Sequence, residues 1–217
     1  MKGDIIKAKP HHYKAAKQAL DIIIEDIRAC EGRFAITVAG ESGAGKSEVA
    51  EALRDELKKD NIQSYIFQQD DYFVYPPHTN AETRKKDISW VGINEVRLDL
   101  LDEHLGYSKE GKTLFEKPLV IFEEDRIDSE KADIGSAKVV IAEGTYTTSL
   151  KNADIRIFID RDHKDTVESR KERAREAQDE FLEKILFIEH NIISAHKVLA
   201  EIIITKDFNA VKGEKNG

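Results

Sequence analysis

The chain has 217 residues, of which 35% are charged and 40% hydrophobic, and its formal net charge is −8. This length suits one α/β domain with a substantial core. The acidic balance and the lack of a basic stripe argue against general nucleic-acid binding, which needs a basic face. Because Cys30 is the single cysteine, an intrachain disulfide and a two-cysteine zinc pair are excluded.

The first residues carry charges where a secretory signal needs an apolar stretch, and no apolar run approaches membrane-spanning length. We therefore expect a cytoplasmic protein with no membrane partner, and the sequence leaves a homo-oligomer open. Apolar residues at helical spacing over 10–30 predict an amphipathic helix that packs on the domain, with a partner-binding helix as the alternative.

A β-rich apolar run at 34–39 predicts a strand, and residues 48–59 predict a helix with one apolar face. Between them lies a complete G-x-x-x-x-G-K-[ST] phosphate-binding loop, in which backbone N–H groups surround the phosphates. Lys46 would reach the β/γ oxygens, and the Ser47 hydroxyl would face Mg²⁺. The pattern predicts that a nucleoside triphosphate, ATP or GTP, contacts Gly40, Glu41, Ser42, Gly43, Ala44, Gly45, Lys46, Ser47 and Glu48.

The next apolar run, 64–69, reads as a second strand, and Pro76-Pro77 then breaks regular structure, so that the stretch to residue 92 reads as a long loop. Further along, the sequence predicts a helix over 95–105, strands at 119–122, 138–142, 155–159 and 202–204, helices over 166–176 and 181–199, and a frayed C-terminal dozen residues.

Strands that alternate with helices indicate an α/β fold, a P-loop NTPase three-layer sandwich with a central parallel sheet, helices on both faces and a helical lid. We predict a single P-loop domain over 1–217, with an N-terminal helical extension at 1–30, an acceptor-binding loop at 70–94 and a lid at 165–180.

Ligands of parallel sheets bind at the carboxyl ends of the strands, where Asp70 and Asp71 follow the second strand. A carboxylate there suits a general base in phosphoryl transfer, although acidic residues also cap turns. Glu143 ends a buried strand, as a magnesium-side acid should, and Asp160 is its rival.

Three arginines at 170, 173 and 175 could fold onto the transferring phosphoryl group, because guanidinium binds phosphate oxygens bidentately. The alternative is a solvated helix with ion pairs, since acidic residues are interleaved. The histidines show no metal-site pattern, because the six-residue spacing of His190 and His196 puts them on different helix faces.

Together these motifs resemble the uridine kinase branch of the P-loop small-molecule kinases, with phosphoribulokinase and nicotinamide riboside kinase as relatives. The resemblance runs from about Phe34 to Phe208. It rests on the phosphate loop, on Gln-Asp-Asp-Tyr-Phe at 69–73, on Val-Val-Ile-Ala-Glu-Gly at 139–144, on Ala-Asp-Ile-Arg-Ile-Phe-Ile-Asp at 153–160 with the arginines after it, and on Ala-Glu-Ile-Ile-Ile at 200–204.

The resemblance implies an ATP- and Mg²⁺-dependent kinase for a small-molecule hydroxyl, with Asp70 as the base and the 5′-hydroxyl of a nucleoside as the acceptor. It implies a metal environment at Ser47 and Glu143. By the same resemblance, the lid arginines are Arg170 and Arg173, which complete the catalytic set with Lys46. Asp87 is implied to hold sugar hydroxyls, and Tyr72 and Trp90 are candidates to stack on the acceptor or to pack the loop.

The family reads pyrimidines with a Tyr and a His in a segment that is Pro-Leu-Val-Ile-Phe-Glu-Glu-Asp here, at 118–125. Loss of such polar readers changes substrate choice strongly and leaves phosphoryl transfer untouched. The alternatives are therefore a kinase for nicotinamide riboside or a pantothenate-like acceptor, or a non-catalytic nucleotide-dependent regulatory module.

Overall fold

A computed structural model describes residues 6–173 and 179–214, apart from the side chains of 172 and 173. Its centre is a six-stranded sheet in the order β2-β5-β1-β6-β7-β8. All neighbours pair in parallel except β7 and β8. The strands are β1 (Phe34–Gly40), β2 (Ser64–Gln68), β5 (Val139–Glu143), β6 (Ile155–Ile159), β7 (Ile202–Ile204) and β8 (Ala210–Lys212).

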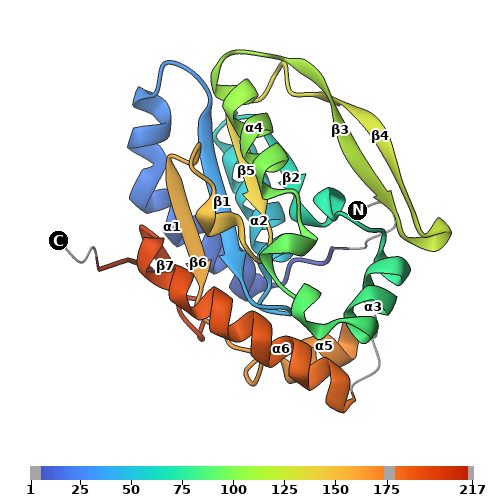
Figure 1. Ribbon diagram of the computed structural model, residues 1–217. Helices are drawn as coiled ribbons and strands as arrows, with labels where there is room; N and C mark the ends of the chain where they lie inside the picture. The colour runs from blue at the N-terminus through green and yellow to red at the C-terminus, as the bar shows by residue number, and fades with distance from the viewer. Residues whose placement is uncertain (1–5, 174–178, 215–217) are drawn as a thin grey trace.

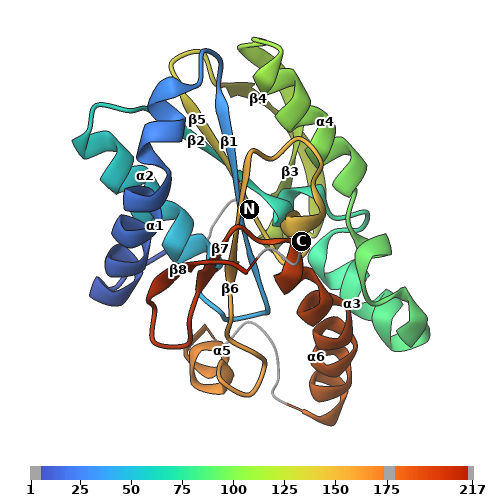
Figure 2. The same ribbon diagram turned by 90° about the vertical axis from the view of Figure 1, so that its left-hand side faces the viewer.

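Helices cover both faces of this sheet (Figure 2). On one face α1 (Pro10–Ala29) and α2 (Lys46–Lys59) pack through residues such as Ile23 and Leu53. On the other, α4 (Leu98–Lys109) and α6 (Glu180–Ile193) contribute Leu101 and Ile193 to a second core. The predicted three-layer α/β architecture is confirmed, and the apolar stripe of the first helix is buried in the chain's own core.

The prediction of a long loop over 76–92 is wrong, because this segment contains the helix α3 (Pro77–Lys86). Pro77 occupies the first turn, where its fixed φ favours helix, and Arg84 lies in the last turn, where cations complement the helix dipole. Most of its own residues are polar, so the sequence shows no apolar stripe over this segment. Short 3₁₀ turns flank it: η1 (Gln69–Tyr72), η2 (Ile88–Trp90) and η3 (Ile93–Glu95).

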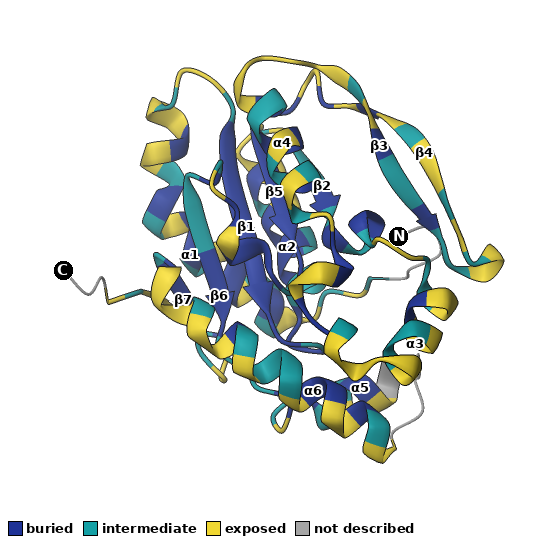
Figure 3. Cartoon of the chain, in the orientation of Figure 1, coloured by how far each residue is buried: buried dark blue, intermediate teal, exposed yellow. Residues whose placement is uncertain are grey.

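The strand predicted at 119–122 is part of a longer antiparallel hairpin, β3 (Leu114–Ile121) and β4 (Arg126–Asp133). The turn η4 (Phe122–Glu124) and the left-handed Asp125, with φ 44°, join the two strands. Much of β4 is exposed (Figure 3), and its charged sequence resembles a loop. The C-terminal residues predicted to fray also form a strand, β8, along the edge of the sheet.

Three helices gather at the end of the sheet where the parallel strands terminate: α3, α5 (Val167–Arg173) and α6 (Figure 1). The remaining turns are η5 (Thr147–Ser149) and η6 (Ser194–Leu199), and η6 continues α6 over part of the predicted 181–199 helix. Among the residues that the structure describes, no helix has the length and apolar character needed to cross a bilayer.

Candidate active site

The phosphate-binding loop connects the end of β1 to the start of α2, as its sequence predicts. Gly43 and Gly45 have φ values of 76° and 103°, a region that other residues rarely adopt. A Cβ at Gly43 would also lie 2.9 Å from Cγ of Arg170. The loop therefore needs glycine at both positions, and it is closed against the helix that follows β6.

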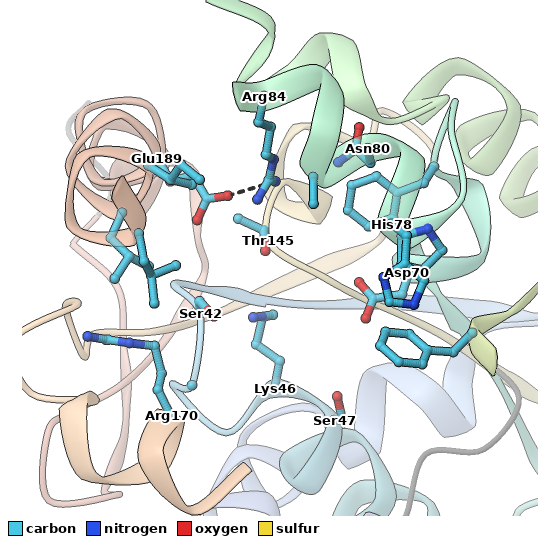
Figure 4. Close-up of a pocket in the computed structure, with 18 of the residues that line it drawn as sticks. Ser42, Lys46, Ser47, Asp70, His78, Asn80, Arg84, Thr145, Arg170 and Glu189 are labelled. Atoms are coloured by element: carbon cyan, nitrogen blue, oxygen red, sulfur yellow. Dashed lines mark hydrogen bonds and ion pairs between the residues drawn. The ribbon is translucent and has the colours of Figure 1, made fainter. Parts of the chain in front are cut away.

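A cavity of about 270 Å³ lies over this loop and is lined by Ser42, Gly43, Lys46 and Ser47 (Figure 4). The side chain of Glu41 is buried beside the loop, and neither it nor Glu48 lines the cavity. Of the residues predicted to contact the nucleotide, Gly40, Glu41, Ala44, Gly45 and Glu48 do not line this cavity.

The residues predicted at the metal site lie together. The Ser47 hydroxyl donates to Oε1 of Glu143 at 3.2 Å. Burial, and then the nearby charge of Asp70, raises the pKa of Glu143 to about 7, although Lys46 and the Ser47 hydrogen bond oppose this shift. Asp160, the rival acid, instead accepts from Nζ of Lys197 at 2.7 Å and does not line the cavity.

The two consecutive aspartates after β2 point to different places. Asp70 lines the cavity opposite Lys46 (Figure 4). Asp71 is buried and accepts from Nζ of Lys117 at 2.9 Å and from the backbone N–H of Val120 at 3.1 Å. Asp71 therefore holds the β3–β4 hairpin, and Asp70 is the carboxylate that faces the phosphate loop.

Arg170 lies on α5 and reaches the cavity from the side opposite Asp70 (Figure 4). Its guanidinium is buried, and Nη1 donates to the carbonyl of His163 at 2.5 Å and to Oγ1 of Thr166 at 2.6 Å. Its Nε and Nη2 make no hydrogen bond to any described residue. Arg170 is therefore buried and not solvated, and its Nη2 lies 3.7 Å from Oε1 of Glu183 on α6. The side chains of Arg173 and Arg175 lie outside the described part of the chain.

Helix α3 supplies a polar wall that the sequence analysis missed. Glu95 is 1% exposed and accepts from Nδ2 of Asn80 at 3.0 Å and from Nη2 of Arg84 at 2.9 Å. Arg84 also bonds Oε1 of Glu189 on α6 at 3.3 Å (Figure 4). Asn80, Arg84 and Glu189 line the cavity, with His78 nearby. The prediction of a loop for this segment could not reveal the wall, because a helix is needed to place Asn80 and Arg84 on the same face.

Three residues predicted to touch the acceptor do not line the cavity. Tyr72 is fully buried, and its hydroxyl lies 2.8 Å from Nδ1 of His104 in the core. Asp87 is exposed and caps η2 by accepting from the N–H of Ser89 at 2.9 Å. Trp90 donates from Nε1 to Oδ1 of Asn80 at 2.8 Å, so it acts on the cavity through Asn80. In this structure Tyr72 packs in the core, as the alternative for it predicts, Asp87 caps a turn, and Trp90 is linked to the cavity by its bond to Asn80.

The comparisons with known proteins identify the family of this chain. A model of the phosphoribulokinase / uridine kinase family matches residues 35–186. The chain belongs to this family. Membership supports a small-molecule kinase that uses a nucleotide.

Among relatives, a uridine kinase of Clostridium novyi (strain NT) is 30% identical over 181 residues, covering 78% of this chain and 85% of the relative. The bifunctional alpha-galactosidase/sucrose kinase AgaSK of Mediterraneibacter gnavus is 27% identical over 82% of this chain, which spans 20% of that protein. The solved phosphoribulokinase from Rhodobacter spheroides shares the fold, with a TM-score of 0.61, 14% identity and coverage of 81% of this chain and 71% of that one.

Proposed function

We propose that this chain transfers the γ-phosphoryl group of ATP, or of GTP, to a hydroxyl of a small molecule, with a nucleoside 5′-hydroxyl as the first acceptor to test. The observation that carries the proposal is one cavity lined by a phosphate loop, by Lys46 and by Asp70 on the facing wall. Phosphoryl transfer asks a protein for this combination of charge stabilisation and one carboxylate that orients the attacking hydroxyl.

The residues present fit a nucleotide and Mg²⁺. The left-handed glycines leave room for phosphates against the backbone, and Ser47 and Glu143 present the oxygen ligands that Mg²⁺ prefers. In this proposal Mg²⁺ is held by Ser47, with Glu143 on the same side, and when bound it neutralises charge on the phosphates. Glu143 must lose its proton before its carboxylate can contribute to holding Mg²⁺.

In the proposed reaction, Asp70 accepts a hydrogen bond from the acceptor hydroxyl and takes its proton. The hydroxyl oxygen forms a bond to the γ-phosphorus while the bond to the bridging oxygen breaks, so that ADP leaves. Lys46 and Arg170 approach the phosphoryl group from the loop and from α5, and their positive charges stabilise the oxygens as charge shifts.

The polar wall favours a neutral acceptor rich in hydroxyls. The charge of Arg84 is compensated by Glu95 and Glu189, so the wall offers donors and acceptors without a net attraction for anions. Phe73 and Phe122 line the same cavity and could stack on a ring. This wall supports a second candidate acceptor, a neutral sugar, which is also consistent with the relative named as a sucrose kinase.

The test is ADP release with a panel of acceptors: uridine, cytidine, purine nucleosides, nicotinamide riboside, pantothenate and neutral sugars. We expect one class to stimulate ADP release in the presence of Mg²⁺, and Asp70→Asn to abolish the stimulation in a protein that still binds nucleotide. If nucleotide binds and none of these acceptors stimulates its turnover, while affinity for a protein partner changes with the nucleotide, the regulatory-module alternative replaces this proposal.

A further inference from the structure

A second cluster of chemically reactive groups lies beside the phosphate loop and outside the cavity. Oε2 of Glu41 accepts from the backbone N–H of His163 at 2.6 Å. Oε1 of the same carboxylate lies 2.6 Å from Nδ1 of His190. The cluster therefore joins three segments: the phosphate loop, the connection between β6 and α5, and helix α6.

One buried polar atom of this cluster lacks a hydrogen-bond partner among the described residues. His163 is 9% exposed, and its Nδ1 makes no hydrogen bond to any described residue. That atom lies 3.5 Å from Oε2 of Glu41, beyond ordinary hydrogen-bond length. Leaving a buried ring nitrogen unpaired costs about 1–3 kcal/mol. His190 is only partly buried, so the cluster remains open to solvent on one side.

We propose that Glu41, His163 and His190 form a binding site for a divalent transition metal of the Zn²⁺ type. One ligand atom from each residue lies within 4.8 Å of the others. Zn²⁺ with ligands at about 2.0–2.2 Å in tetrahedral geometry places ligand atoms roughly 3.3 Å apart. His190 Nδ1 lies 2.6 Å from Oε1 of Glu41, and His163 Nδ1 lies 3.5 Å from Oε2 of the same carboxylate, so the Glu41 side chain must turn to offer one oxygen to an ion held by both imidazoles.

The donor set indicates the metal. Two imidazoles and one carboxylate suit Zn²⁺ or Co²⁺, whereas Mg²⁺ prefers oxygen ligands and several waters. Three protein ligands leave the fourth position of a tetrahedral ion to water, which the exposed side at His190 admits. The spacing of the histidines in the sequence does not predict this site, because the partner of His190 is a carboxylate 149 residues away and not His196.

A metal here would affect the phosphate loop. The backbone carbonyl of His163 also accepts from Nη1 of Arg170, and α6 carries Glu189 of the cavity wall. A bound ion would therefore connect the phosphate loop to the segment that positions Arg170 and to the helix α6, which contributes to the polar wall. We expect it to raise the unfolding temperature of the nucleotide-free protein by mass action.

The test is calorimetric titration of untagged, chelator-treated protein with Zn²⁺, in millimolar Mg²⁺ to occupy oxygen-only sites. We expect saturable binding of one Zn²⁺ per chain. Loss of an outer-shell partner weakens metal sites roughly 10- to 100-fold, so His163→Gln and His190→Gln, which remove ligands, should each weaken binding at least that much. Titration of the wild-type protein with Co²⁺ should give the visible absorption of a tetrahedral ion with nitrogen ligands.

His196→Gln is the matched control, because Nδ1 of His196 is also buried without a hydrogen-bond partner among described residues but lies outside the cluster. It should bind Zn²⁺ like the wild type, and circular dichroism would verify that each variant is folded. The proposal is overturned if the wild type shows neither saturable Zn²⁺ binding nor the Co²⁺ spectrum. It is equally overturned if folded His163→Gln and His190→Gln bind as tightly as the wild type.

Discussion

Replacement of Glu143 by glutamine should stabilise the nucleotide-free protein at alkaline pH. Glu143 is 5% exposed, and its pKa is raised from 4.5 to about 7 because burial and the charge of Asp70 disfavour the ionised form. In the unfolded chain the same carboxyl ionises at its ordinary pKa. The folded state therefore loses stability, relative to a neutral side chain, as the pH rises between these two values.

The size of the effect follows from the shift. A difference between pKa values of 4.5 and about 7 corresponds to about 3 kcal/mol at 1.36 kcal/mol per unit. Glutamine keeps the shape of the side chain and carries no charge, so Glu143→Gln should avoid this cost. The advantage of the variant should be small near pH 4.5, grow up to about pH 7 and stay constant above it.

The measurement is urea unfolding of both proteins at several pH values in the presence of a chelator, with the difference in unfolding free energy plotted against pH. Glu116→Gln is a suitable control, because it makes the same substitution at an exposed position on β3. Added Mg²⁺ should then stabilise the wild type and leave Glu143→Gln unaffected, if this carboxylate helps to hold the ion.

A stability difference between wild type and Glu143→Gln that does not change between pH 5 and pH 8 would refute the reasoning, since it would mean that Glu143 ionises equally easily in both states. A variant less stable than the wild type at pH 8 would refute it too. That result would show that the contacts of the ionised carboxylate with Lys46 and Ser47 outweigh its burial.

Three further predictions concern the cavity. Asp70→Asn should lower kcat by about 10²- to 10⁴-fold while calorimetry finds nucleotide affinity unchanged, because only the proposed base is lost; near-normal turnover would contradict this role. Arg170→Lys keeps the charge but cannot bond His163 and reach phosphate with one planar fork, so steady-state kinetics should show at least a roughly 10-fold loss of kcat; an unchanged kcat would exclude Arg170 from the reaction. Trp90→Phe removes the hydrogen bond to Asn80, worth about 0.5–1.5 kcal/mol, and should raise KM for the acceptor by roughly 2- to 12-fold with KM for nucleotide unchanged; an equal rise in both constants would argue for a general loss of structure.

The sequence predicts most of the sheet because its strands are buried on both faces. Continuous apolar runs such as the one in β1 leave little ambiguity, and the glycine pattern after it locates the phosphate loop. Glu143 also follows from its place at the end of an apolar strand. The structure adds what periodicity cannot express, namely that Glu143 and not Asp160 lies against Ser47.

The polar wall of the cavity escapes prediction for a physical reason. Helix α3 has only Asn80 buried, so no apolar stripe marks it as a helix. Its position depends instead on Glu95, which binds Asn80 and Arg84 from a separate turn. Such tertiary hydrogen bonds join segments that are distant in sequence, and they leave no periodic pattern of apolar residues. The edge strand β8 likewise shows no such pattern.

The same contacts explain where acceptor choice can reside. Glu95 is buried and accepts from Asn80, from Arg84 and from the backbone of Gly92, so its loss would leave several donors unpaired. The groups that face the cavity, Asn80 and Arg84, are instead presented by a helix with few core contacts. The phosphate loop contributes Ala44 to the opposite core, so the wall and the loop are held by separate sets of contacts. In the proposed kinase, the phosphate loop between β1 and α2 would bind the nucleotide, whereas α3 and α6 would present the polar wall to the acceptor.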